Sequence, residues 1–86
     1  MNNNVKYNGK LNVIGSVIRE YRENQNLSQS DLSAKLTLLG IDIPKNSVQR
    51  LECGSRIIKD FELAGISKVL NISTDVLLKD FIKSLN

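Results

Sequence analysis

Apolar residues recur at helical spacing in several stretches of this chain, with polar residues between them. The first such stretch predicts a helix that begins near Asn12, with Asn26 as a left-handed residue at its end. Its apolar positions are Ile14, Val17, Ile18 and Tyr21. A second helix begins after Ser28, because Asp31 three residues later completes a capping box. We expect Leu32, Leu36 and Leu39 to form its buried stripe and Gly40 to end it.

A short third helix follows the second after an extended turn at 41–43. Pro44 suits its first position, and Cys53 and Gly54 end it. Val48 and Leu51 form its inward face. The other faces carry polar side chains long enough to reach a partner, namely Lys45, Asn46, Gln49 and Arg50, together with the small Ser47.

Two more helices complete the chain. Asp60 caps a helix that runs to about Leu70, and Asn71 stops it. Ser73 or Asp75 opens the last helix, whose apolar stripe is Leu78, Phe81, Ile82 and Leu85. Because no stretch alternates like a strand, the predicted fold class is all-α, a compact five-helix bundle. We expect Phe61 and most of the leucines in its core.

The composition narrows the class of protein. The 86 residues, 41% hydrophobic and 24% charged, suit one ordinary globular domain. We expect residues 1–10 to be a flexible segment and residues 11–86 to form the domain. The polar start resembles no secretory signal and no apolar run could span a membrane, so a cytoplasmic location is expected.

One cysteine and no histidine are present. An internal disulfide, a Cys/His zinc site and a His-based nucleophilic pair are therefore excluded. We expect no catalytic residue, cofactor, metal or small-molecule ligand, and we interpret Cys53 as a small packing residue.

Positive charge is concentrated in the first two thirds of the chain. Residues 1–59 hold nine Lys/Arg against five Asp/Glu, whereas residues 60–86 hold three against four. This excess suits a polyanionic partner.

The second and third helices together carry a specific pattern. The second helix begins with Leu27, Ser28, Gln29, Asp31 and Leu32. The third helix ends with Arg50, Leu51, Glu52, Cys53 and Gly54. From about Leu11 to Leu78 the chain resembles the phage-repressor and Cro-like helix-turn-helix family, the xenobiotic-response-element (XRE) regulators of bacteria. It differs from the tight form of the motif by several extra residues at 37–43, which we expect to lengthen the helix and the loop.

The resemblance implies a transcriptional regulator, a repressor, whose third helix, at about 44–53, enters the major groove of double-stranded DNA. It implies that Lys45, Asn46, Gln49 and Arg50 read bases. Phosphate contacts are implied for Gln29, Ser47, Arg56 and Lys59. It also implies a partly buried ion pair between Arg22 and Glu52, and a close helix approach at the small Ser33.

The final helix offers a dimer interface. Four helices can close the core, which would leave the stripe of Leu78, Phe81, Ile82 and Leu85 for a second copy in a two-fold homodimer. The alternative is a protein-interaction module on the same fold, such as an antitoxin, an antirepressor or an adaptor.

Overall fold

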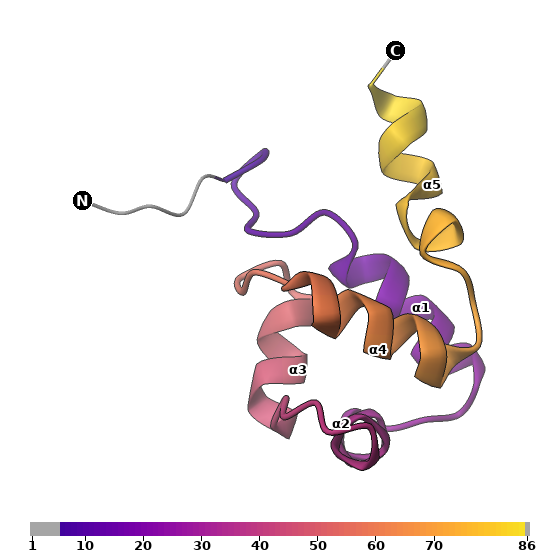
Figure 1. The fold of residues 1–86 in the computed structure, drawn as a ribbon. Coiled ribbons are helices and arrows are strands. Elements are labelled where there is room, and N and C mark those ends of the chain that lie inside the picture. The colour runs from indigo at the N-terminus through magenta and orange to yellow at the C-terminus, as the bar shows by residue number, and fades with distance from the viewer. Residues whose placement is uncertain (1–5, 86) are drawn as a thin grey trace.

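Five helices follow one another within residues 6–85, the part of the chain that the computed structural model describes (Figure 1). They are α1 (Gly15–Asn24), α2 (Gln29–Leu38), α3 (Lys45–Glu52), α4 (Asp60–Leu70) and α5 (Thr74–Ser84). The predicted all-α, five-helix architecture is confirmed. Within the described range, no helix is both long and apolar enough to cross a membrane.

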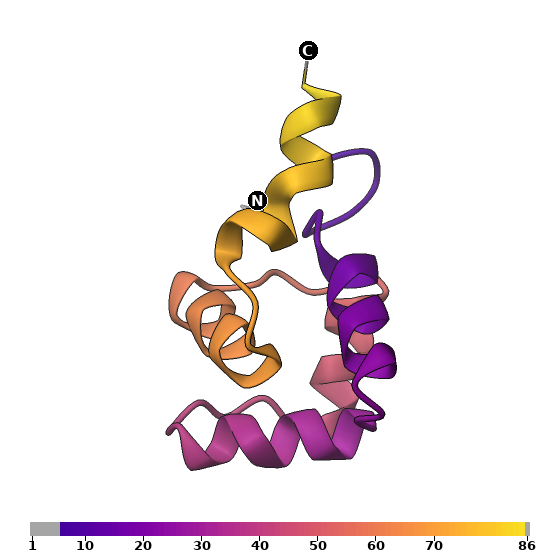
Figure 2. The same cartoon turned by 90° about the vertical axis from the view of Figure 1, so that its right-hand side faces the viewer.

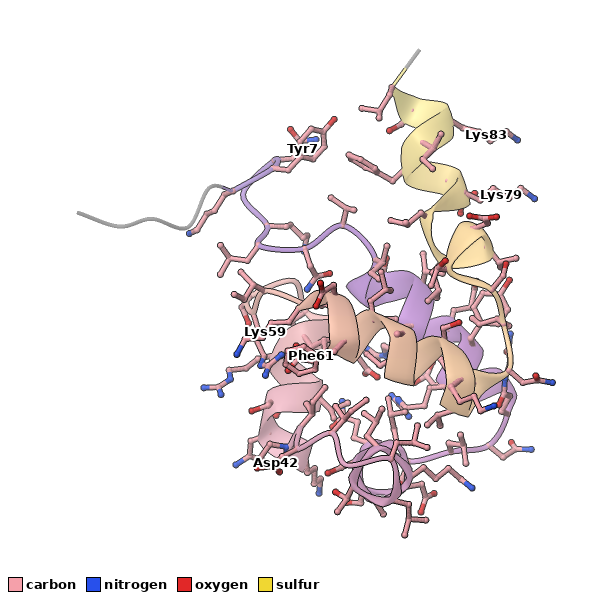
Figure 3. All side chains as sticks on the ribbon, viewed as in Figure 1. Tyr7, Asp42, Lys59, Phe61, Lys79 and Lys83 are labelled. Carbon is pink, nitrogen blue, oxygen red and sulfur yellow. The ribbon has the colours of Figure 1, made fainter. Side chains whose placement is uncertain are left out.

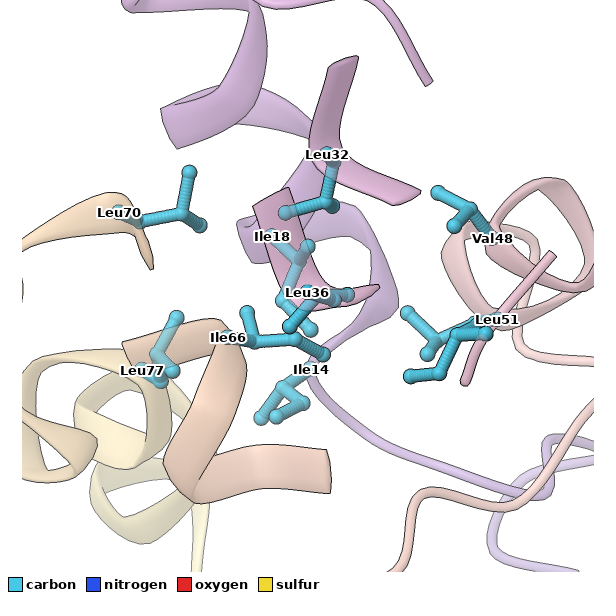
Figure 4. Packing of buried hydrophobic residues seen from close by; sticks show 10 residues of the cluster. Ile14, Ile18, Leu32, Leu36, Val48, Leu51, Ile66, Leu70 and Leu77 are labelled. Atoms are coloured by element: carbon cyan, nitrogen blue, oxygen red, sulfur yellow. The ribbon is translucent and has the colours of Figure 1, made fainter. Parts of the chain in front are cut away.

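The core lies where α1, α2, α3 and α4 meet (Figure 4). The α3 helix packs against both α1 and α2, while α4 packs against α1, α2 and α5. Figures 1 and 2 place α2 and α5 at opposite ends of the molecule. The buried apolar residues are Ile14, Ile18, Leu32, Leu36, Ile43, Val48, Leu51, Ile66, Leu70 and Leu77.

The first four helices all end through a left-handed residue. These residues are Asn26, Gly40, Gly54 and Asn71, with φ between 56° and 80°. At Gly40 the backbone N–H donates to Thr37 and the next N–H donates to Leu36, which satisfies two carbonyls at the end of α2. The sequence prediction of these stop positions is confirmed. The turn at Gly40 ends α2 and so limits where α3 can begin.

Helix starts follow the sequence less closely. The capping box of Ser28 and Asp31 is present, and the Ser73 hydroxyl caps α5. However, Pro44 lies at the cap position of α3 rather than inside it. Asp60 is wrong as the cap of α4, because it is the first helical residue and Lys59 precedes it at the cap position.

Three expected core residues are exposed. Leu39 is 45% exposed because α2 has already ended and Ile43 fills the core instead. Phe61 is 55% exposed because the inward stripe of α4 runs through Glu62, Ile66 and Leu70. Cys53 lies in solvent at the end of α3. These predictions were wrong.

Residues 7–10 form a turn that contacts the domain. The backbone groups of Tyr7 and Lys10 pair in an isolated bridge. The Lys10 ammonium donates to the carbonyl of Cys53 at 3.2 Å, and the Leu11 N–H donates to Gly54 at 2.7 Å. Residues 1–5 of the segment expected to be flexible lie outside the described residues.

Candidate nucleic-acid interface

The α3 helix buries one face and presents the other to solvent. Val48 and Leu51 are each 1% exposed. The outward side chains of Lys45, Asn46, Gln49 and Arg50 are exposed, and Ser47 is half-buried. Arg50 donates to the Ser47 hydroxyl at 3.2 Å, a weak contact at the surface. The polar face of α3 is therefore open to a partner.

A side-chain hydrogen bond fixes the approach to α3. The half-buried Ser33 hydroxyl of α2 donates to the carbonyl of Ile43 at 2.7 Å, while the Ile43 side chain is fully buried. The family resemblance implied a close helix approach at Ser33 but not this bond. Because Ile43 precedes Pro44 and Lys45, the bond sets where the polar face begins.

The far end of α3 is held by a buried ion pair. Arg22 Nε lies 2.6 Å from Glu52 Oε2, and Nη2 donates to Oε1 at 3.0 Å. The Arg22 guanidinium also donates to the carbonyl of Leu27. This hydrogen bonding raises the pKa of Arg22 above its usual value. The expected ion pair is thus present and joins α1 to the last turn of α3.

Gln29 joins the same cluster from the start of α2. Its side-chain amide donates to Glu52 Oε1 at 3.1 Å. One carboxylate thereby connects three helices, α1 through Arg22, α2 through Gln29, and α3 through Glu52 itself. This arrangement braces α3 against both neighbouring helices.

Asn12 is a positioning residue that sequence reasoning missed. Its amide donates to the carbonyls of Leu51 and Arg56 at 2.9 and 2.8 Å. Its oxygen accepts from the N–H groups of Ile14 and Gly15, which explains why α1 begins after it. A Cβ at Gly15 would collide with the carbonyl of Leu51, so α1 and α3 touch through their backbones here. An Asn two or three residues before an apolar repeat was the available signal.

The loop after α3 is tied down by a second ion pair. Arg56 donates to both oxygens of Glu62, at 2.9 and 3.0 Å, and Glu62 is 3% exposed. Glu62 also accepts from the backbone N–H of Lys59. The Arg56 hydrogen bonds hold the pKa of Glu62 below its usual value, and the same contact raises the pKa of Arg56. Lys59 itself is exposed.

The apolar stripe of α5 is divided between the domain and solvent. Leu78 packs against the core cluster. The Phe81 ring meets Tyr7 edge to face, with centroids 5.0 Å apart. Ile82 and Leu85 are 56% and 59% exposed. The described chain therefore covers only part of the stripe.

The helix pair α2–α3 and its bracing are those of a helix-turn-helix, and the sequence profile described as Helix-turn-helix matches residues 18–77. This chain belongs to the XRE-type helix-turn-helix family. It is accordingly a DNA-binding transcription regulator of that type.

A solved structure of the complex between the SinR and SinI proteins contains a similar chain, SinR. The TM-score is 0.66 and the sequences are 27% identical, over 86% of this chain and 68% of that one. No curated protein sequence matches this chain significantly.

Proposed function

We propose that the protein binds a specific double-stranded DNA site as a homodimeric repressor in the cytoplasm, with α3 in the major groove. The supporting observation is the open polar face of α3, since its first turn carries Lys45 and Asn46 and its exposed middle carries Gln49 and Arg50. Arg and Lys match guanine O6 and N7, while Asn and Gln match adenine. These four side chains would read the bases.

Phosphate contacts would set the register of α3 in the groove. We assign them to Ser47 in the first turn of α3, to Gln29 at the start of α2, and to the exposed Lys59 at the start of α4. Both terminal nitrogens of Arg56 donate to Glu62. Because a guanidinium has five N–H donors, we assign Arg56 a phosphate contact in addition to its role of holding the loop. No catalytic chemistry is part of this proposal.

The salt dependence of DNA binding tests this function. In a plot of the logarithm of the binding constant against the logarithm of salt concentration, each phosphate that a protein cation neutralises adds about −0.9 to the slope. We expect a steep slope for the wild-type protein on its selected site, reduced by about 0.9 in Lys59→Ala. An affinity that does not change with salt concentration would instead support a protein-interaction module. That alternative is favoured by the similar solved structure, which is a complex of two proteins.

The dimer would form through α5. Ile82 and Leu85 offer exposed apolar surface at the end of the molecule opposite α2. We expect the double variant Ile82→Asp/Leu85→Asp to be a monomer in sedimentation equilibrium, because burying unpaired carboxylates between two copies costs free energy. Leu38→Asp, on the exposed end of α2, is the matched control. A wild-type protein that stays monomeric at all concentrations would remove the dimer from the proposal.

A further inference from the structure

Phe61 is a large apolar side chain that the fold leaves in solvent. The chain has four aromatic residues, two Phe and two Tyr, and this ring is 55% exposed in the first turn of α4. Burying a Phe ring stabilises a small domain, and this chain leaves more than half of that contribution unused. The inward stripe of α4 explains why the ring is not in the core, but not what it contacts.

A lysine ammonium lies near the face of the ring. The ammonium of Lys59 is 5.9 Å from its centroid. Figure 3 shows both side chains where α4 begins, on the side of the molecule that carries α3. The intervening Asp60 turns a carboxylate oxygen to the Phe61 N–H at 2.7 Å, and Glu62 is occupied by Arg56. The side chains exposed here are thus an apolar ring, the ammonium of Lys59 and the carboxylate of Asp60, and the first two suit a DNA strand.

We propose that Phe61 is a further DNA-contacting residue, whose ring packs on a deoxyribose next to the phosphate bound by Lys59. The DNA backbone alternates anionic phosphates with apolar sugar faces, so a ring beside an ammonium complements two adjacent units of one strand. Contacts to sugar and phosphate position a protein without reading sequence. Phe61 therefore strengthens binding to every duplex. This inference rests on the proposed DNA binding through α3.

The salt series separates the ring from the charge. Phe61→Ala should weaken binding roughly tenfold at every salt concentration and leave the log–log slope unchanged, because an apolar contact releases no counterions. Lys59→Ala should instead lower the slope by about 0.9. The control is Leu38→Ala, which removes a side chain that is 86% exposed at the end of α2 and should bind like the wild type.

Fluorescence provides a direct readout of contact. The sequence contains no tryptophan, so Phe61→Trp introduces a single tryptophan whose emission can be separated from that of the two tyrosines. Adding duplex should change its emission because DNA displaces water from the ring, whereas Leu38→Trp should not respond. Such a change at position 61 alone supports the contact.

Two results would overturn the inference while leaving DNA binding intact. One is wild-type affinity in Phe61→Ala. The other is a loss in Phe61→Ala that reproduces the slope change of Lys59→Ala, because the ring would then act only by holding the ammonium. If the wild-type protein binds no duplex, the proposed function and this inference fail together.

Discussion

The carboxylate of Glu52 accepts two hydrogen bonds from the guanidinium of Arg22, at 2.6 and 3.0 Å, across 30 positions of sequence. Both residues are buried, at 7% and 6% exposure. The pair fixes the end of α3 to α1, so the orientation of α3 depends on it.

Removing one partner of this pair should be costly. Arg22→Met leaves Glu52 charged and buried, and we expect a loss of about 3–5 kcal/mol in the free energy of unfolding, measured by urea denaturation. The matched control is Arg19→Met, which breaks an exposed pair with Glu23 and should cost less than about 1 kcal/mol. The double variant Arg22→Met/Glu52→Met should recover part of the loss. Equal effects of Arg22→Met and Arg19→Met would contradict the structural role.

Asn12 should matter more than its place in an N-terminal segment suggests. Asn12→Ala removes the acceptor for the Ile14 and Gly15 N–H groups and two bonds to the end of α3 and its loop, and we expect about 2 kcal/mol of destabilisation. Asn24→Ala, at the exposed end of α1, serves as the control and should be nearly neutral in the same urea titration. A neutral Asn12→Ala would show that α1 and α3 are joined by other contacts.

Acid should weaken the fold through Glu62. Its pKa is lowered in the folded protein by the Arg56 hydrogen bonds, so its contribution is present above the usual glutamate pKa and is lost as pH falls through the lowered value. Asp31 acts in the same direction, because the Ser28 N–H lowers its pKa. The free energy of unfolding, measured by chemical denaturation from neutral to acidic pH, should fall less steeply for Glu62→Gln than for the wild type. A curve parallel to that of the wild type would show that Glu62 does not contribute.

Local signals in the sequence predicted most of the fold. Asn26, Gly40 and Asn71 mark helix ends because left-handed backbone favours Asn and Gly, and Ser28 with Asp31 marks a start through two bonds made within one turn. Apolar spacing was sufficient to place most of the core.

The errors arose where contacts between distant segments decide the outcome. Asn12 bonds to residues 39 and 44 positions away, which no local pattern encodes. The ion pair between Arg56 and Glu62 was not predicted, because it depends on how the loop folds back against α4. Phe61 fits an apolar repeat, yet the direction of α4 turns its ring outward.

The central claim, that α3 reads bases while Lys59 only holds phosphate, is tested by measuring affinities for every single-base change in a selected site. Arg50→Ala should lose its preference at one base pair, by roughly 1–3 kcal/mol, and keep the others. Lys59→Ala should weaken binding to all sequences by the same factor. Identical profiles for the two variants would contradict the account.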